Sequence, residues 1–207
     1  MINQLSKRYL LCLVICIFII SLIVGCAGGG GTTPPSGQNN QAGEPAKQES
    51  KDEYIKAGMY KIGQDIPAGE YFIVANGMAY FQVSKDSSGS IDSIIANDNF
   101  NNTRYITVAD GQYLEIKSSK MISSDKAPIQ QPKDGKYPEG MYKIGKEIPA
   151  GEYKVVSDGG LAYFEVTKDS KGDLNSIIAN DNFEGEKYIT VKDENYLKLN
   201  GCSLIAK

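Results

Sequence analysis

The chain has 207 residues, 41% of them hydrophobic, a formal net charge of −3 and no histidine. An acidic chain without a basic cluster lacks the electrostatic footprint of a nucleic-acid-binding protein, so we expect no nucleic acid partner. The absence of histidine removes the commonest general base and a common metal ligand. The sequence also has no phosphate-binding loop and no paired cysteines spaced for zinc, so we expect no enzyme, no metal and no cofactor.

Residues 1–25 are predicted to be a secretory signal peptide, because Lys7 and Arg8 precede an apolar run. That run, residues 10–24, is shorter than the roughly 20 residues that a membrane-spanning helix needs. An uncleaved anchor helix is the alternative. The run ends in IVGC, residues 23–26, which resembles the lipobox of bacterial lipoproteins. The resemblance implies that Cys26 carries diacylglycerol and tethers the chain to the outer face of the bacterial cytoplasmic membrane.

The remainder of the chain is built around an internal repeat. Residues 58–122 align with residues 140–205, with one extra glycine in the second copy. The stretch before the first copy is rich in Gly, Pro, Gln, Asn, Ser and charged residues, which predicts a disordered tether. We therefore divide the chain as follows: signal peptide 1–25, lipidated cysteine and tether 26–53, first β module 54–123, linker 124–136 and second β module 137–207.

Each copy has the pattern of a β protein and no helical period. The Ile66–Gly69 segment fits a type I turn, and Asn76-Gly77 predicts a hairpin between strands at 70–74 and 78–83. A short apolar run, Ser93 to Ala96, is followed by polar residues, and two more strands are expected at 105–108 and 113–116. The sequence thus predicts an all-β protein with two tandem antiparallel β-sandwich or barrel modules, each of five to seven strands.

The strings GMYKIGKEIPAGEY, SIIANDNF and YITV resemble a small repeated β module of secreted and lipid-anchored proteins of Gram-positive bacteria. The resemblance covers both copies. It implies no activity and transfers no functional residue.

Tyrosines form the first candidate binding surface. Alternation along the strands directs apolar residues inward and these tyrosines outward, where they suit carbohydrate stacking or a protein interface. The alternatives are cross-strand packing of the tyrosines or a second buried face. The residues are Tyr80, Tyr105 and Tyr113 in the first copy, and Tyr163, Tyr188 and Tyr196 in the second.

Two polar triplets form the second candidate. Residues 97–99 and 180–182 both read Asn-Asp-Asn, and the amide and carboxylate oxygens of Asn97, Asp98, Asn180 and Asp181 suit a sugar hydroxyl or a calcium ion. The alternative is a turn, formed by Asn and Asp, that stops a buried strand.

These features favour a non-enzymatic, lipid-anchored protein whose two modules bind a partner in the cell envelope, either a glycan or a protein. A spacer without a ligand and a hydrolase that uses an Asp/Glu pair are the alternatives. If Cys26 carries lipid, Cys202 has no partner within the mature chain. We expect it to be a buried thiol, and an intermolecular bridge is the alternative.

Overall fold

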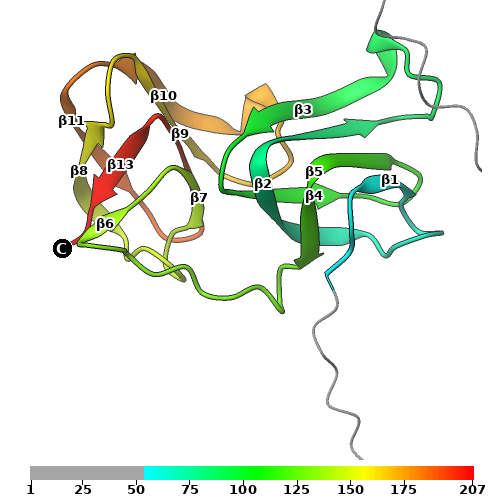
Figure 1. Ribbon diagram of the computed structural model, residues 1–207, viewed down its shortest axis with the longest axis horizontal. Helices are drawn as coiled ribbons and strands as arrows, with labels where there is room; N and C mark the ends of the chain where they lie inside the picture. Colours follow the sequence, from blue (N-terminus) through cyan, green and yellow to red (C-terminus); the bar gives the residue numbers. More distant parts are fainter. Residues whose placement is uncertain (1–53) are drawn as a thin grey trace, which may run out of the picture. The chain divides into compact units, whose positions relative to one another are not determined.

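The computed structural model describes residues 54–207 (Figure 1). Antiparallel strands dominate this part of the chain, and its helical segments are two short 3-10 turns, η1 (Ile91–Ser93) and η2 (Leu174–Ser176). The all-β prediction is confirmed. The predicted signal peptide, Cys26 and the tether lie outside the described residues. Among residues 54–207, no helix is long and apolar enough to cross a membrane.

The first repeat, residues 58–122, forms one sheet, drawn in cyan and green in Figure 1. The strands follow the order β1-β5-β2-β3, and β4 pairs with β2. Their bounds are β1 (Gly58–Lys61), β2 (Gly69–Ser84), β3 (Ile94–Phe100), β4 (Thr103–Val108) and β5 (Tyr113–Ser123).

The second repeat, residues 140–205, forms two sheets with the orders β10-β9-β12-β7 and β11-β8-β13-β6. The pairing repeats that of the first copy, since β8 and β9 together align with β2, and β12 and β13 with β5. The bounds are β6 (Lys136–Tyr137), β7 (Gly140–Lys143), β8 (Gly151–Ser157), β9 (Ala162–Thr167), β10 (Ile177–Phe183), β11 (Glu186–Val191), β12 (Tyr196–Asn200) and β13 (Cys202–Ile205).

The hairpin predicted at Asn76-Gly77 is wrong. Both halves of β2 pair with β5, and the register shifts between Ala75 and Tyr80. Gly77 has a φ of 76°, which lets the strand bulge and bend without reversing its direction. A bulge with a glycine at positive φ and a two-residue hairpin turn place the same demand on the backbone, so the same dipeptide satisfies either geometry.

Each repeat has an apolar cluster of its own, and a third cluster joins them. The first is centred on Phe81 and Leu114, the second on Val155 and Leu197. The third contains Phe72, Tyr105 and Ile122 of the first repeat together with Met141 of the second.

The predicted linker, residues 124–136, contributes ordered contacts between the repeats. Gln130 accepts a hydrogen bond from Thr103 Oγ1 at 2.8 Å and donates one to the Met141 carbonyl at 2.8 Å. Its Nε2 also lies 3.1 Å from a carboxylate oxygen of Glu147.

Cys202 is a buried free thiol, as predicted. Its Sγ lies 3.4 Å from the carbonyl oxygen of Tyr163. Burial is the main cause that raises the pKa of this thiol to about 11, which keeps it protonated and unreactive at neutral pH.

Candidate functional site

The two polar triplets lie inside strands, which corrects the alternative that they form strand-ending turns. Asn97, Asp98 and Asn99 pair in register with Gln82, Phe81 and Tyr80 of β2. The triplet at 180–182 pairs in the same way with β9. Each strand continues through its polar residues because the next residue, Phe100 or Phe183, again points into the core, as the alternation along a strand requires.

The structure brings one predicted tyrosine and one predicted asparagine together in each repeat. Tyr80 donates a hydrogen bond to Gln82 at 2.8 Å, and Asn97 Nδ2 lies 3.4 Å from the Tyr80 hydroxyl. In the second repeat Tyr163 donates to Glu165 at 2.7 Å, and Asn180 Nδ2 donates to the Tyr163 hydroxyl at 3.1 Å. Desolvation and the bond to Glu165 raise the pKa of Tyr163 to about 12.

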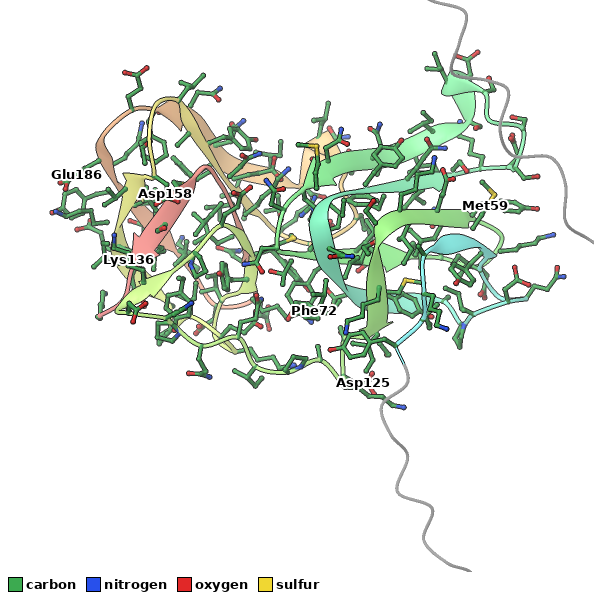
Figure 2. The ribbon with its side chains drawn as sticks, viewed as in Figure 1. Met59, Phe72, Asp125, Lys136, Asp158 and Glu186 are labelled. Atoms are coloured by element: carbon green, nitrogen blue, oxygen red, sulfur yellow. The ribbon has the colours of Figure 1, made fainter. Side chains whose placement is uncertain are left out.

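In the first repeat this pair belongs to a wider surface, which we call the outer face. It is the side of β1, β5, β2 and β3 that carries Tyr80, Asn97, Tyr113 and Lys117. Lys117 Nζ lies 5.6 Å from the centre of the Tyr80 ring, within the range of a cation–π contact. Lys61, Met59 and Glu115 complete it; Met59, labelled in Figure 2, is 48% exposed.

Four residues of this face, Met59, Lys61, Glu115 and Lys117, were missed by the sequence reasoning, which followed only aromatic and Asn/Asp positions. Lys61 Nζ lies 5.7 Å from the centre of the Tyr113 ring, so the second tyrosine of this face, half-buried like Tyr80, also has a lysine beside it. The signal was present in the sequence, because Met59, Lys61, Glu115 and Lys117 share the strand parity of the outward residues.

Tyr105 does not face solvent, which corrects its predicted exposure. Its side chain is completely buried and its hydroxyl donates to Glu147 of the second repeat at 2.9 Å. Phe72, labelled in Figure 2, packs against its ring with a centroid separation of 5.0 Å. Alternation does direct Tyr105 away from the core of its own repeat, but the second repeat covers that side. Desolvation and the charge of Glu147 raise the pKa of Tyr105.

Tyr196 is half-buried in the same contact between the repeats. Its hydroxyl donates to Glu70 of the first repeat at 2.6 Å. The Glu70 carboxylate also accepts hydrogen bonds from Ser124, Ser170 and Lys143, and it forms an ion pair with Lys143. Burial alone would raise the pKa of Glu70, but these four hydrogen bonds outweigh it and lower the pKa.

The two aspartates of the triplets have different partners. Asp98 lies 3.3 Å from Arg104 Nε and also forms an ion pair with Lys198 of the second repeat. Burial is the main cause that lowers the pKa of Arg104. Asp181 pairs with Lys187 within its own repeat, and both side chains are about 40% exposed, at 43% and 40%. The hydrogen bond from Lys187 lowers the pKa of Asp181.

A loop of the second repeat, residues 168–173, completes the contact between the repeats. Thr107 N donates to the Ser170 carbonyl at 3.1 Å, and the two hydroxyl groups lie 2.8 Å apart. Gly172 packs so closely that a Cβ at this position would lie 2.9 Å from Ala96 Cβ. The loop therefore docks on β3 and β4 of the first repeat.

Tyr188 is the predicted tyrosine with the clearest exposure. It aligns with Tyr105, yet 63% of it is exposed. The residue that aligns with Phe72 is Lys154, which pairs with Glu186 at 2.9 Å. The β8–β11 side of the second repeat is thus an open and more polar version of the surface that the first repeat buries.

Residues 54–207 contain no group of three or more Asp, Glu, Cys or His side chains that could hold a metal ion. No family model matches the chain, and no curated protein matches it. The geometry is therefore the basis for any functional assignment.

Proposed function

We propose that this chain is a lipid-anchored, extracytoplasmic, non-enzymatic protein that binds an envelope partner, a glycan or a protein, through the outer face. The observation that carries the proposal is the Tyr–Asn pair, Tyr80 with Asn97, beside the exposed cation of Lys117. An aromatic ring, amide groups and an exposed ammonium group, which pairs with Glu115 at 3.0 Å, together offer stacking, hydrogen bonding and charge on one sheet surface.

The aligned face of the second repeat supports the same reading. There Tyr196, Lys143 and Lys198 all contact the first repeat, so this type of sheet face already serves as a contact surface within the chain. In the first repeat the corresponding residues, Tyr113 and Lys61, have no such cover from the part of the chain that the structure describes.

The test uses soluble residues 54–207 and measures retention on purified peptidoglycan, on a glycan array and on envelope proteins. The double variant Tyr80→Ser/Tyr113→Ser should lower retention by at least about tenfold, because aromatic residues dominate binding surfaces of this kind. The control is Tyr188→Ser, a change at an exposed tyrosine off the outer face, which should leave glycan retention unchanged. Equal retention by all three proteins would remove the proposal.

The proposed anchor has a separate test. We expect Cys26→Ser to abolish incorporation of labelled fatty acid and to block removal of the leader by the lipoprotein peptidase. A Cys26→Ser protein that still incorporates fatty acid and matures normally would show that the lipobox reading is wrong.

A spacer without ligand is the second candidate. The contact between the repeats favours it, because the polar groups of Glu70 in this contact are already hydrogen-bonded. The carboxylate of Glu70 in the first repeat accepts hydrogen bonds from Lys143, Ser170 and Tyr196 of the second, which ties the two repeats together. The hydrogen bonds to Glu70 also make it a poor general acid for a hydrolase, because they lower its pKa and keep it ionised.

A further inference from the structure

The contact between the repeats uses two different faces of the same fold, so within residues 54–207 one copy of each face remains without a partner. The second repeat contributes its docking face, the outer side of β7 and β12 with the 168–173 loop. The first repeat contributes its receiving face, formed by β2, β3 and β4. A heterologous contact of this kind does not close on itself. The unused faces are the outer face with the 85–90 loop, and the β8–β11 side of the second repeat.

The unused docking face keeps the polar residues of the one in use. Lys143, Tyr196 and Ser170 bind Glu70 in the existing contact. The residues that align with these three in the first repeat are, in the same order, Lys61, Tyr113 and Ser87.

The loop of the unused docking face already has the docked conformation. Gly89 has a φ of 72° and Gly172 a φ of 74°. Ser88 N donates to Asp86 Oδ1 at 2.9 Å, as Lys171 N donates to Asp169 Oδ1 at 3.1 Å. A Cβ at Gly89 would meet nothing within 4 Å, so the 85–90 loop is preformed and uncovered.

The unused receiving face keeps the groups that such a loop and face contact. In the first repeat these are the acceptor Glu70, the hydroxyl of Thr107, the small Ala96 and the ring of Tyr105. The aligned residues of the second repeat are all exposed: Glu152, Thr190, Ala179 and Tyr188.

The charged residues of the two faces differ between the copies. The receiving side has Lys154 in place of Phe72 and Glu186 in place of Thr103, and these two form an ion pair at 2.9 Å. The unused docking face has Glu115 in place of Lys198 and Lys117 in place of Asn200, which pair at 3.0 Å. The charge pair that carries over from the contact within the chain is Lys61 with Glu152, and opposite charges across an interface steer association.

We propose that the outer face and 85–90 loop of one chain bind the β8–β11 side of a second copy, head to tail. The inference rests on the proposed function, since it names the partner of the same outer face. The contact is weaker than the one within the chain, where the linker holds the partners at an effective concentration of the order of millimolar. Glu186, labelled in Figure 2, marks the receiving side.

The experiment measures the mass of residues 54–207 by sedimentation from about 10 µM to about 1 mM, a range that reaches the effective concentration of a short linker. The mass should rise with concentration. Lys61→Glu and Glu152→Lys should each weaken association by about tenfold or more, since each places like charges across the contact. An equimolar mixture of the two variants restores opposite charges and should associate again. The contact within the chain uses Lys143 and Glu70, so both variants should melt like the parent.

A single mass at every concentration would overturn the inference, and so would association that neither variant weakens or that the mixture fails to restore. Retention on peptidoglycan without self-association would leave the proposed function standing and remove this inference alone.

Discussion

Tyr105 and Tyr188 occupy the same position in the two repeats, and their surroundings differ completely. Tyr105 is enclosed by Phe72, Met141 and the carboxylate of Glu147, whereas Tyr188 is 63% exposed. A residue's alignment with its counterpart therefore fixes its strand and its direction but not its burial, which depends on what covers that side.

This difference gives a matched pair of substitutions. Tyr105→Ser should lower the free energy of unfolding by about 3 kcal/mol or more, because it removes a buried aromatic ring and leaves Glu147 short of a donor. Tyr188→Ser should change it by no more than about 0.5 kcal/mol. Urea titration of residues 54–207 at low protein concentration measures both. Similar losses for the two variants would contradict the buried position of Tyr105.

The Glu70 carboxylate makes the stability of the chain depend on pH. Its pKa in the folded chain lies below the ordinary value of 4.5, so the unfolded chain takes up protons first as the pH falls. The stabilisation is therefore complete above pH 4.5 and is lost as the pH falls through the folded pKa. We expect Glu70→Gln to be less stable than the parent at pH 7, and the gap to narrow below pH 4.5. Melting curves from pH 7 to pH 3 measure this, with the exposed Glu152→Gln as control. A gap that stays constant over that range would contradict the assignment.

At the level of elements, the strands could be predicted but the path between them could not. Alternation of apolar and polar residues locates β4 and β5, because one face of each is buried in its own repeat. Asn76-Gly77 does not form a hairpin because β2 pairs with β5 on both sides of the bend. A pairing between strands far apart in the sequence cannot be read from a dipeptide. The Asn-Asp-Asn triplets fail as turns for the same reason.

The same limit applies to the candidate site. The outward direction was predicted correctly for Tyr80, Tyr105 and Tyr188, but the predicted solvent exposure of Tyr105 was wrong because a surface of the second repeat covers it. No pattern within one strand reports a contact between two repeats. The sequence does hold one clue: Phe72 of the first repeat aligns with Lys154 of the second. An apolar residue on the outward side of only one copy indicates that this side is covered in that copy.

The loops at 85–90 and 168–173 allow a prediction at the same scale. Gly172→Ala and Gly89→Ala both place a side chain at positive φ, which costs about 1 kcal/mol in each case. Only Gly172→Ala adds a Cβ within 2.9 Å of Ala96, so it should cost about 1–3 kcal/mol more than Gly89→Ala. Thermal unfolding at a protein concentration below any self-association measures the difference. Equal destabilisation would show that the 168–173 loop does not pack on the first repeat.

In the whole molecule, polar groups and a small apolar cluster join the two repeats. Glu70, Lys143 and Tyr196 make one network, and Asp98, Arg104 and Lys198 make another. Buried charges of this kind contribute little net stability when they are paired but cost several kcal/mol when one partner is removed. The networks therefore set which faces meet, and the apolar cluster around Phe72 and Tyr105 supplies most of the favourable free energy of the contact.

Separation of the repeats tests the predicted boundaries. Residues 54–123 and 137–207 each contain an apolar cluster of their own, so we expect both fragments to fold and to give β-type circular dichroism. The first fragment should lose more stability, because it exposes Phe72, Tyr105 and Ile122, whereas the second exposes mainly Met141. Each buried side chain of this size contributes about 1.5–3 kcal/mol, which is a large share of the 5 kcal/mol or so that a domain of this length has in total.

The measurement is urea unfolding of each fragment beside residues 54–207. The midpoint of the first fragment should fall furthest, and Phe72→Lys, which copies the residue found at position 154, should recover part of the loss by making the uncovered face polar. In residues 54–207 the same Phe72→Lys change should destabilise instead, because there it places an amine in the apolar cluster. Fragments that both remain unfolded would show that the two repeats depend on a shared core and that the boundary at residues 124–136 does not separate two modules.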